Sequence, residues 1–118
     1  MTDAKTSLSV LIAGPYKSGT NGDAEKIKAN LLYLESFALP IFEAGHLPFI
    51  GEWLALPLIQ QSEDKNEERY LYPVAHRLIA RCDAILRVPG ESKGADQDVK
   101  LAKELGIPVY YSLDELLN

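Results

Sequence analysis

Short aliphatic runs alternate with longer amphipathic stretches along the chain. Leucine, valine, isoleucine and alanine dominate four such runs, which are bounded by glycine, proline or charged residues. Runs of this length and composition predict strands that are buried on both faces of a sheet. The predicted strands cover residues 8–13, 47–50, 84–88 and 107–111.

The stretches between these strands have helical spacing. Apolar residues recur every three or four positions from Ile27 to Ile41, after Asp23 as a plausible N-cap, and Gly45 is the expected stop. Pro40 is expected to kink this helix or to end its regular part. Further helices are predicted over residues 71–82, 95–105 and 113–117.

The middle of the chain gives a weaker pattern. Residues 52–61 are apolar but contain Pro57, so no element is assigned to them. Residues 62–69 are a charge run, which predicts a solvated loop or the start of a helix. A mobile lid is the alternative interpretation of this run.

The alternation of strands and helices predicts parallel βαβ units with right-handed crossovers. We therefore expect one α/β domain over residues 1–118, a flavodoxin-like or Rossmann-like three-layer sandwich with strand order 2-1-3-4. Such sheets bind ligands outside the carboxyl ends of their strands. The loops over residues 14–22 and 89–94, which follow the first and third strands, are expected to line one cleft.

Composition and charge narrow the range of partners. Seventeen acidic residues against twelve basic ones give a net charge of −5, which argues against a nucleic-acid polymer because its affinity comes from lysine and arginine. The single cysteine, Cys82, excludes an intramolecular disulfide and a four-cysteine zinc site, and we expect no metal or other cofactor. Residues 1–7 show no secretory signal and no run reaches membrane-spanning length, so we expect a soluble cytoplasmic protein without membrane contact.

Asp98 interrupts the apolar side of its predicted helix. At ~100° per residue from Ala95, the inward arc contains Ala102 and Leu105, and Asp98 falls between them at ~300°. A buried carboxylate is costly unless a partner compensates its charge. Asp98 is therefore either a structural residue, bonded to a first-turn N–H or to an arginine such as Arg87, or a functional group aimed into the cleft.

The loops around the cleft carry residues suited to a ligand. Ser92 and Gly94 stand at a helix N-terminus, where free N–H groups and the helix dipole favour an anion, although ordinary capping by Ser92 is the alternative. His76 lies at the edge of its predicted helix, which favours a surface role. The candidate catalytic residue is Asp98, and the candidate substrate-binding residues are Gly14, Pro15, Tyr16, Gly90, Ser92 and Gly94.

Four segments resemble one known superfamily. They are VLIAGPY (10–16), AGHLPFI (44–50), CDAILRVPGESKGADQD (82–98) and LAKELGIPVYY (101–111). Together they resemble the nucleoside 2-deoxyribosyltransferase-like superfamily, especially its small bacterial and phage branch, over nearly the whole chain. The resemblance implies an enzyme in which a glutamate attacks the N-glycosidic bond of a nucleoside or its 5′-monophosphate. Water or a new base then resolves the covalent glycosyl-enzyme.

The resemblance also assigns roles to single positions. The glutamate nucleophile lies four residues after the glycine that corresponds to Gly94, which is the position of Asp98. Ser92 matches the serine that holds the 5′-phosphate in relatives that hydrolyse nucleotides. Three departures stand out: Asp98 is one methylene shorter than glutamate, Ala75 occupies the position of a second acidic residue, and Leu11 replaces a tyrosine of the first strand.

Two functions are therefore consistent with the sequence. The first is an N-glycosidic-bond hydrolase or transferase; the second is a non-catalytic nucleotide-binding or sensing domain of the same fold, which the departures favour. In both, the partner is a small nucleoside or nucleotide. We also expect a homodimer or higher homo-oligomer, because Tyr33 and Phe37 add aromatic surface beside their helical stripe and because relatives complete their pockets from a neighbouring subunit.

Overall fold

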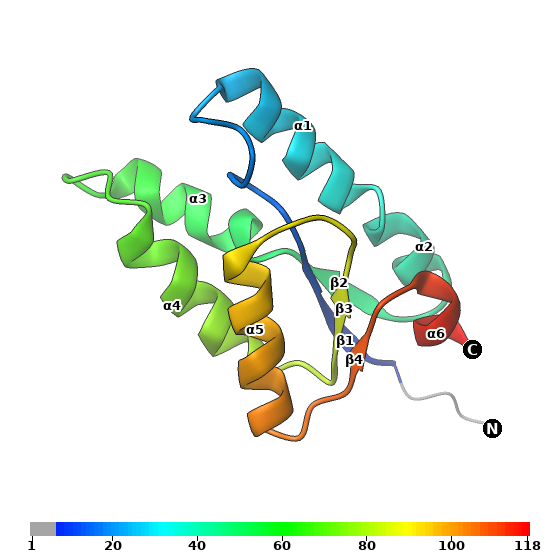
Figure 1. Ribbon diagram of the computed structural model, residues 1–118. Helices are drawn as coiled ribbons and strands as arrows, with labels where there is room; N and C mark the ends of the chain where they lie inside the picture. The colour runs from blue at the N-terminus through cyan, green and yellow to red at the C-terminus, as the bar shows by residue number, and fades with distance from the viewer. Residues whose placement is uncertain (1–6) are drawn as a thin grey trace.

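A four-stranded, all-parallel sheet forms the centre of the molecule (Figure 1). The computed structural model describes residues 7–118; residues 1–6, which include most of the stretch expected to lack a secretory signal, lie outside it. The strands follow the order β2-β1-β3-β4, so the predicted α/β class and strand order are confirmed. The strands are β1 (Ser9–Ala13), β2 (Leu47–Phe49), β3 (Ala84–Arg87) and β4 (Val109–Tyr110).

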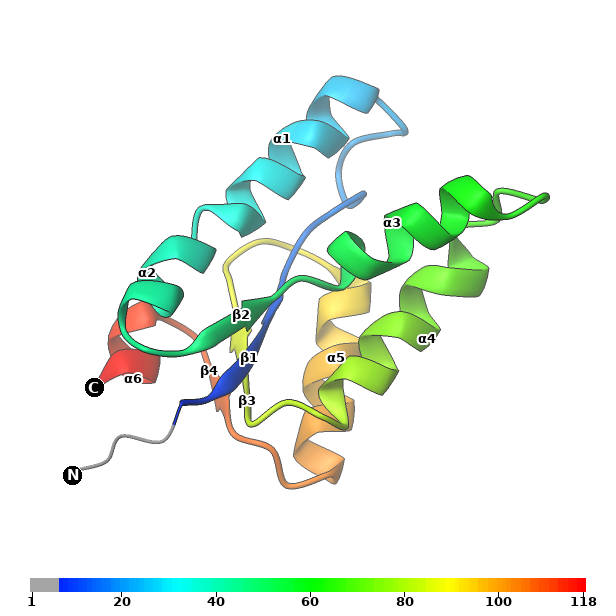
Figure 2. The same ribbon diagram turned by 180° about the vertical axis from the view of Figure 1, so that it is seen from behind.

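Helices cover both faces of this sheet, as two opposite views show (Figure 1, Figure 2). One layer contains α1 (Ala24–Glu35), α2 (Ala38–Glu43) and α6 (Leu113–Leu117). The other contains α3 (Gly51–Gln61), α4 (Glu68–Ile79) and α5 (Lys93–Glu104).

Each layer has its own apolar cluster. In β1, Val10 and Ile12 belong to the cluster under α1 and α2, whereas Leu11 and Ala13 belong to the cluster under α4 and α5. Successive side chains of a strand point to opposite faces, so both faces of β1 are apolar. Cys82 is buried in the second cluster.

The first predicted helix is two helices, with a break at Ser36 and Phe37. Pro40 has no N–H to donate to the carbonyl four residues earlier, which belongs to Ser36, and its ring crowds that carbonyl. The helical ladder therefore breaks one turn before the proline, and Pro40 itself lies inside α2.

The unassigned residues 52–61 form α3, which begins directly after β2. Pro57 sits inside this helix and leaves the carbonyl of Trp53 without its helical donor. Both residues are exposed, so water can satisfy that carbonyl. The charge run that follows is a mostly exposed loop leading into the first residues of α4, which is the solvated arrangement predicted for it.

The apolar face of α5 is largely as predicted. Ala95, Asp98 and Ala102 are buried. Leu105 is 51 % exposed, so its predicted inward position is wrong. The reason is that α5 ends at Glu104, and Leu105 lies in the turn that follows.

A helix that crosses a bilayer needs about 20 mostly apolar residues. None of the helices within residues 7–118 is both long enough and apolar enough to cross a membrane.

Gly14 marks a close approach between the end of β1 and its neighbours. A Cβ atom at this position would lie 2.3 Å from Cγ2 of Val88 and 2.8 Å from Cδ2 of Leu34. Both neighbours are fully buried and have little room to shift. The position therefore requires glycine for packing, whatever it does for a ligand.

We expect Gly14→Ala to lower the free energy of unfolding by ~1–3 kcal/mol, the usual cost of overpacking a core. Gly51→Ala is the matched control, because its Cβ would lie 3.7 Å from Cβ of Ala75, an ordinary contact. Urea denaturation of both variants checks this expectation. Equal losses of stability would show that close packing at Gly14 is not the cause.

Candidate active site

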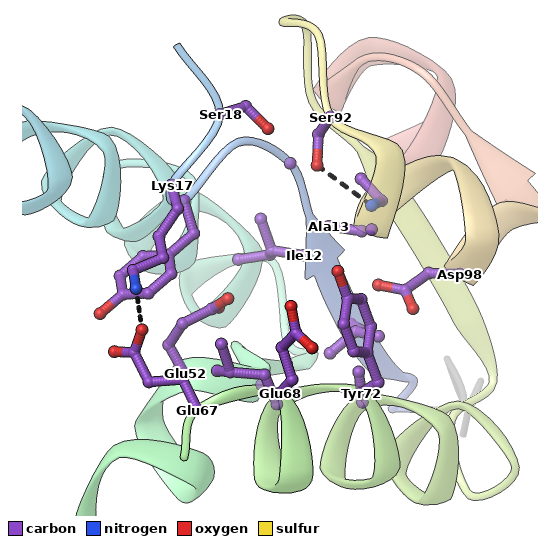
Figure 3. Close-up of a pocket in the computed structure, with 18 residues that line it drawn as sticks. Ile12, Ala13, Lys17, Ser18, Glu52, Glu67, Glu68, Tyr72, Ser92 and Asp98 are labelled. Carbon is purple, nitrogen blue, oxygen red and sulfur yellow. Dashed lines mark hydrogen bonds and ion pairs between the residues drawn. The ribbon is translucent and has the colours of Figure 1, made fainter. Parts of the chain in front are cut away.

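A pocket of about 310 Å³ opens at the carboxyl end of β1 (Figure 3). The end of β1 and its following loop, the start of α3, the helix α4 and the N-terminus of α5 form its walls. The lining side chains differ in character from one end to the other. Figure 3 shows Ser18 and Ser92 at one end, hereafter the serine end, and Glu52, Glu67 and Glu68 at the other, hereafter the acidic end.

Most of the residues singled out in the sequence meet in this pocket. Five of them line it: Gly14, Tyr16, Ser92, Gly94 and Asp98. The loops after β1 and β3 therefore lie on one cleft, as the topology predicts.

Pro15 and Gly90 do not line the pocket. Gly90 faces a separate shallow depression together with Pro89 and Tyr111. A Cβ atom on Gly90 would lie 2.5 Å from Cγ of Pro15, and the φ angle of Gly90 is +123°. These two residues contact each other, so the need for glycine here comes from backbone conformation and packing.

Asp98 is buried in the second turn of α5, with 9 % of its surface exposed. Its Oδ1 atom has no hydrogen-bond partner among the residues that the structure describes. Nε2 of His76 lies 3.8 Å from this oxygen, which is longer than a hydrogen bond, and this nitrogen is equally unpartnered within residues 7–118. The side chain of His76 is partly exposed, as expected of a surface residue, but one nitrogen of its ring lies close to the Asp98 carboxylate.

Neither of the two structural roles expected for Asp98, a bond to a first-turn N–H or to Arg87, is present among the described residues. Arg87 donates to Asp96 at 3.0 Å and to the carbonyl of Val88 at 2.6 Å. The first-turn N–H of Ala95 donates to Oγ of Ser92 at 3.1 Å. In the described part of the chain, neither the arginine nor a first-turn amide bonds to the Asp98 carboxylate.

The environment of Asp98 favours its protonated form. Burial first and the negative charge of Glu52 second raise the pKa of Asp98, Arg87 partly offsets them, and the result is a pKa of about 7. Burial also raises the pKa of Glu52, and burial together with Glu52 raises the pKa of the Tyr16 hydroxyl. Burial therefore favours the protonated forms of both Asp98 and Glu52.

The acidic end has little compensation. Lys17 forms an ion pair with Glu67, and it is the one lysine among the described residues that line the pocket. Glu68 and Glu52 line the same end. Tyr72, 40 % exposed, stands between this end and Asp98 in Figure 3.

Ser92 belongs to the serine end and also caps α5. Its Oγ accepts the hydrogen bond from Ala95, which leaves its hydroxyl hydrogen to donate elsewhere. Capping and ligand binding are thus compatible at this residue.

Several residues that line the pocket are not among the candidate site residues predicted from the sequence. Glu52 was missed because Pro57 prevented any assignment to its segment, although a carboxylate directly after the second strand was a usable signal. Glu68 was missed because α4 begins earlier than its apolar stripe suggests. Tyr72 lies within the predicted helix, but no local pattern indicates that this part of the helix lines the pocket. In residues 7–118 no group of three or more histidine, cysteine, aspartate or glutamate side chains could hold a metal ion.

No family model matches the chain. No curated protein sequence matches it either. The resemblance described above therefore rests on its four sequence segments.

The raised pKa of Asp98 has a consequence for stability. In the unfolded chain this carboxyl titrates near ~3.9, so between about pH 4 and pH 7 the folded state binds more protons and the free energy of unfolding falls as pH rises. Asp98→Asn removes this penalty. We expect the variant to be more stable than the wild type at pH 8 by on the order of 2–4 kcal/mol, and similar to it at pH 4.

Chemical denaturation at both pH values measures this difference. Glu104→Gln is the control, because Glu104 is exposed at the far end of α5 and does not line the pocket. A constant difference between wild type and Asp98→Asn across this pH range would mean that the carboxyl is not destabilised in the folded state.

Proposed function

We propose that this protein is an N-glycosidic-bond hydrolase or transferase that acts on nucleosides or nucleoside 5′-monophosphates, with Asp98 as the nucleophile. One observation carries the proposal: a buried carboxylate without a hydrogen-bond partner in residues 7–118 opens onto a pocket of ligand size. Pockets for small molecules start near ~300 Å³. A buried carboxylate without a structural partner destabilises the fold, and groups of this kind are found at catalytic and binding sites.

The reaction needs a nucleophile and a proton donor. An ionised oxygen of Asp98 would form a bond to the anomeric carbon, while the electrons of the C–N bond pass to the leaving base. Glu52, whose pKa is raised by burial, would supply the proton that a neutral base requires. Water would then attack the same carbon, return a proton to Glu52 and release Asp98, as in retaining glycosidases.

The resemblance supports the same assignment by an independent route. Counting four residues from Gly94 leads to Asp98, and the burial of Asp98 supports the choice of the same residue. The resemblance also places Ser92 at the phosphate, in agreement with its free hydroxyl hydrogen at the serine end.

A non-catalytic nucleotide-binding domain is the second candidate. A specific observation favours it: with a pKa of about 7, Asp98 is only partly ionised at neutral pH. Ala75 lines the pocket at the position where relatives carry a second acid, so a methyl group stands there in place of a carboxylate.

Self-association remains part of the proposal. Phe37 packs against the core and the hydroxyl of Tyr33 donates to the carbonyl of Pro89, so these aromatic side chains are partly used within the chain. Exposed Leu32, Leu39 and Phe42 add apolar surface to the same two helices.

Substitutions of Asp98 separate the two candidates. We expect Asp98→Asn to abolish base release while ligand binding persists, because the amide is nearly isosteric but cannot attack the sugar. Asp98→Glu is expected to keep activity, since it restores the reach of the usual glutamate. Base release from a panel of nucleosides and monophosphates, with mass spectrometry for a glycosyl adduct, measures both.

Wild-type turnover by Asp98→Asn would remove Asp98 from the mechanism. A wild-type protein that binds but never cleaves would favour the sensing domain.

Ser92→Ala tests the serine end. We expect it to weaken binding of a nucleoside 5′-monophosphate by ~1–2 kcal/mol and to leave the nucleoside nearly unaffected, because the lost bond is to a charged group. The variant also loses the cap of α5, so Ser112→Ala, which removes the equivalent cap of α6 far from the pocket, is the matched control. Equal weakening of both ligands, measured by calorimetry, would reduce Ser92 to a helix cap.

A further inference from the structure

The acidic end of the pocket has a chemistry that the proposed function leaves unspecified. We propose that this pocket selects nucleosides whose base carries a positive charge, such as N-alkylated purines and pyrimidines. The proposal rests on the proposed function for the identity of the ligand as a nucleoside. It rests on the charge of the lining residues for the preference itself.

The charges at the acidic end do not balance. Glu52, Glu67 and Glu68 line it, and Lys17 compensates Glu67 alone. Arg87 is turned to Asp96, outside the pocket lining. A neutral base leaves Glu68 without an ionic partner among the described residues, whereas a cationic base would pair with Glu68 and would also favour the ionised form of Glu52, whose pKa burial raises.

A second observation points to a ligand in the same pocket. The Oδ1 atom of Asp98 is unpartnered in the described residues, and its residue, nine-tenths buried, faces the same pocket (Figure 3). The ring of Tyr72 lines the pocket between Asp98 and the acidic end. Carboxylates combined with an exposed aromatic ring form a favourable environment for a flat organic cation.

A metal ion is a poorer occupant than an organic cation. In residues 7–118 no three acidic, histidine or cysteine side chains converge closely enough to hold a metal. The carboxylates are instead spread along the wall made by α3 and α4, which suits an extended ligand.

A charged base also simplifies the chemistry. The lone pair of an Asp98 oxygen forms the bond to the anomeric carbon, and the C–N electrons return to the positive ring, which leaves as a neutral molecule. This step consumes no proton. Water then forms the second bond to the anomeric carbon, a proton passes to Glu52, and the electrons of the ester C–O bond return to Asp98. The absence of a carboxyl group at Ala75 is no obstacle to such a substrate.

The test uses pairs of probes that differ by one methyl group and one charge. They are adenosine against 1-methyladenosine and cytidine against 3-methylcytidine, each also as the 5′-monophosphate, with binding measured by calorimetry at pH 7 and low salt. We expect each methylated probe to bind ~10-fold more tightly than its parent, with or without the phosphate, and the ratio to shrink as salt is added.

Glu68→Gln should reduce this ratio by ~3-fold, because it removes one exposed charge from the acidic end. Glu104→Gln, which removes a charge of the same sign outside the pocket, should leave the ratio unchanged. Equal or weaker binding of the methylated probes overturns the proposal, and so does a ratio that both variants change alike.

Base release from the same probes keeps the two proposals apart. Tighter binding of the cations without any cleavage supports the charge preference and contradicts the enzyme. Cleavage of neutral and cationic probes that bind with equal affinity supports the enzyme and contradicts the charge preference. Binding of none of the eight probes overturns both.

Discussion

The parallel pairing of β1 with β3 is the constraint on which the candidate site depends. Ala13 at the end of β1 is paired with Arg87 at the end of β3, so the chain leaves both strands at the same edge of the sheet. The first loop brings Gly14 and Tyr16 to that edge, and the second brings Ser92 and starts α5 there. A helix that starts at this point turns the inward residue of its second turn toward the pocket. In this chain that residue is an aspartate.

The aspartate works against the stability of the fold that positions it. Its carboxyl is buried, its pKa is raised to about 7, and it has no hydrogen bond at Oδ1 within residues 7–118. Arg87 lies near enough to affect the charge of Asp98 but is committed to Asp96. Such a local conflict, in a domain whose core is otherwise apolar, is expected at functional sites, where chemistry and folding place different demands on one residue.

The fold and the centre of the site could be predicted because they follow from periodicity. The composition and order of the strands predicted the parallel sheet, and the helical wheel predicted the burial of Asp98. The interruption expected from Pro40 is present and lies at Ser36, one turn before the proline. No element could be predicted for the segment with Pro57, although it forms a helix with the proline on its exposed side. The predicted inward position of Leu105 is wrong because α5 ends at Glu104. The acidic end was missed because its residues come from the unassigned segment that forms α3 and from the charge run at the start of α4, and no local pattern states which distant side chains share a pocket.

The two ends of the pocket allow a ligand to be contacted at two separate points. The serine end offers a hydroxyl donor at a helix N-terminus, and the acidic end offers carboxylates beside the ring of Tyr72. Between them, the carboxyl of Asp98 is only partly ionised when the pocket holds no cation. A positive base would favour the ionised form of Asp98, because an opposite charge nearby lowers the pKa of a carboxyl group. On the proposed mechanism, such a substrate would increase the ionised fraction of the nucleophile that attacks it, whereas a neutral base would leave much of that carboxyl protonated. The raised pKa of Asp98, which favours a binding domain when the protein is considered alone, then becomes part of the selectivity of an enzyme.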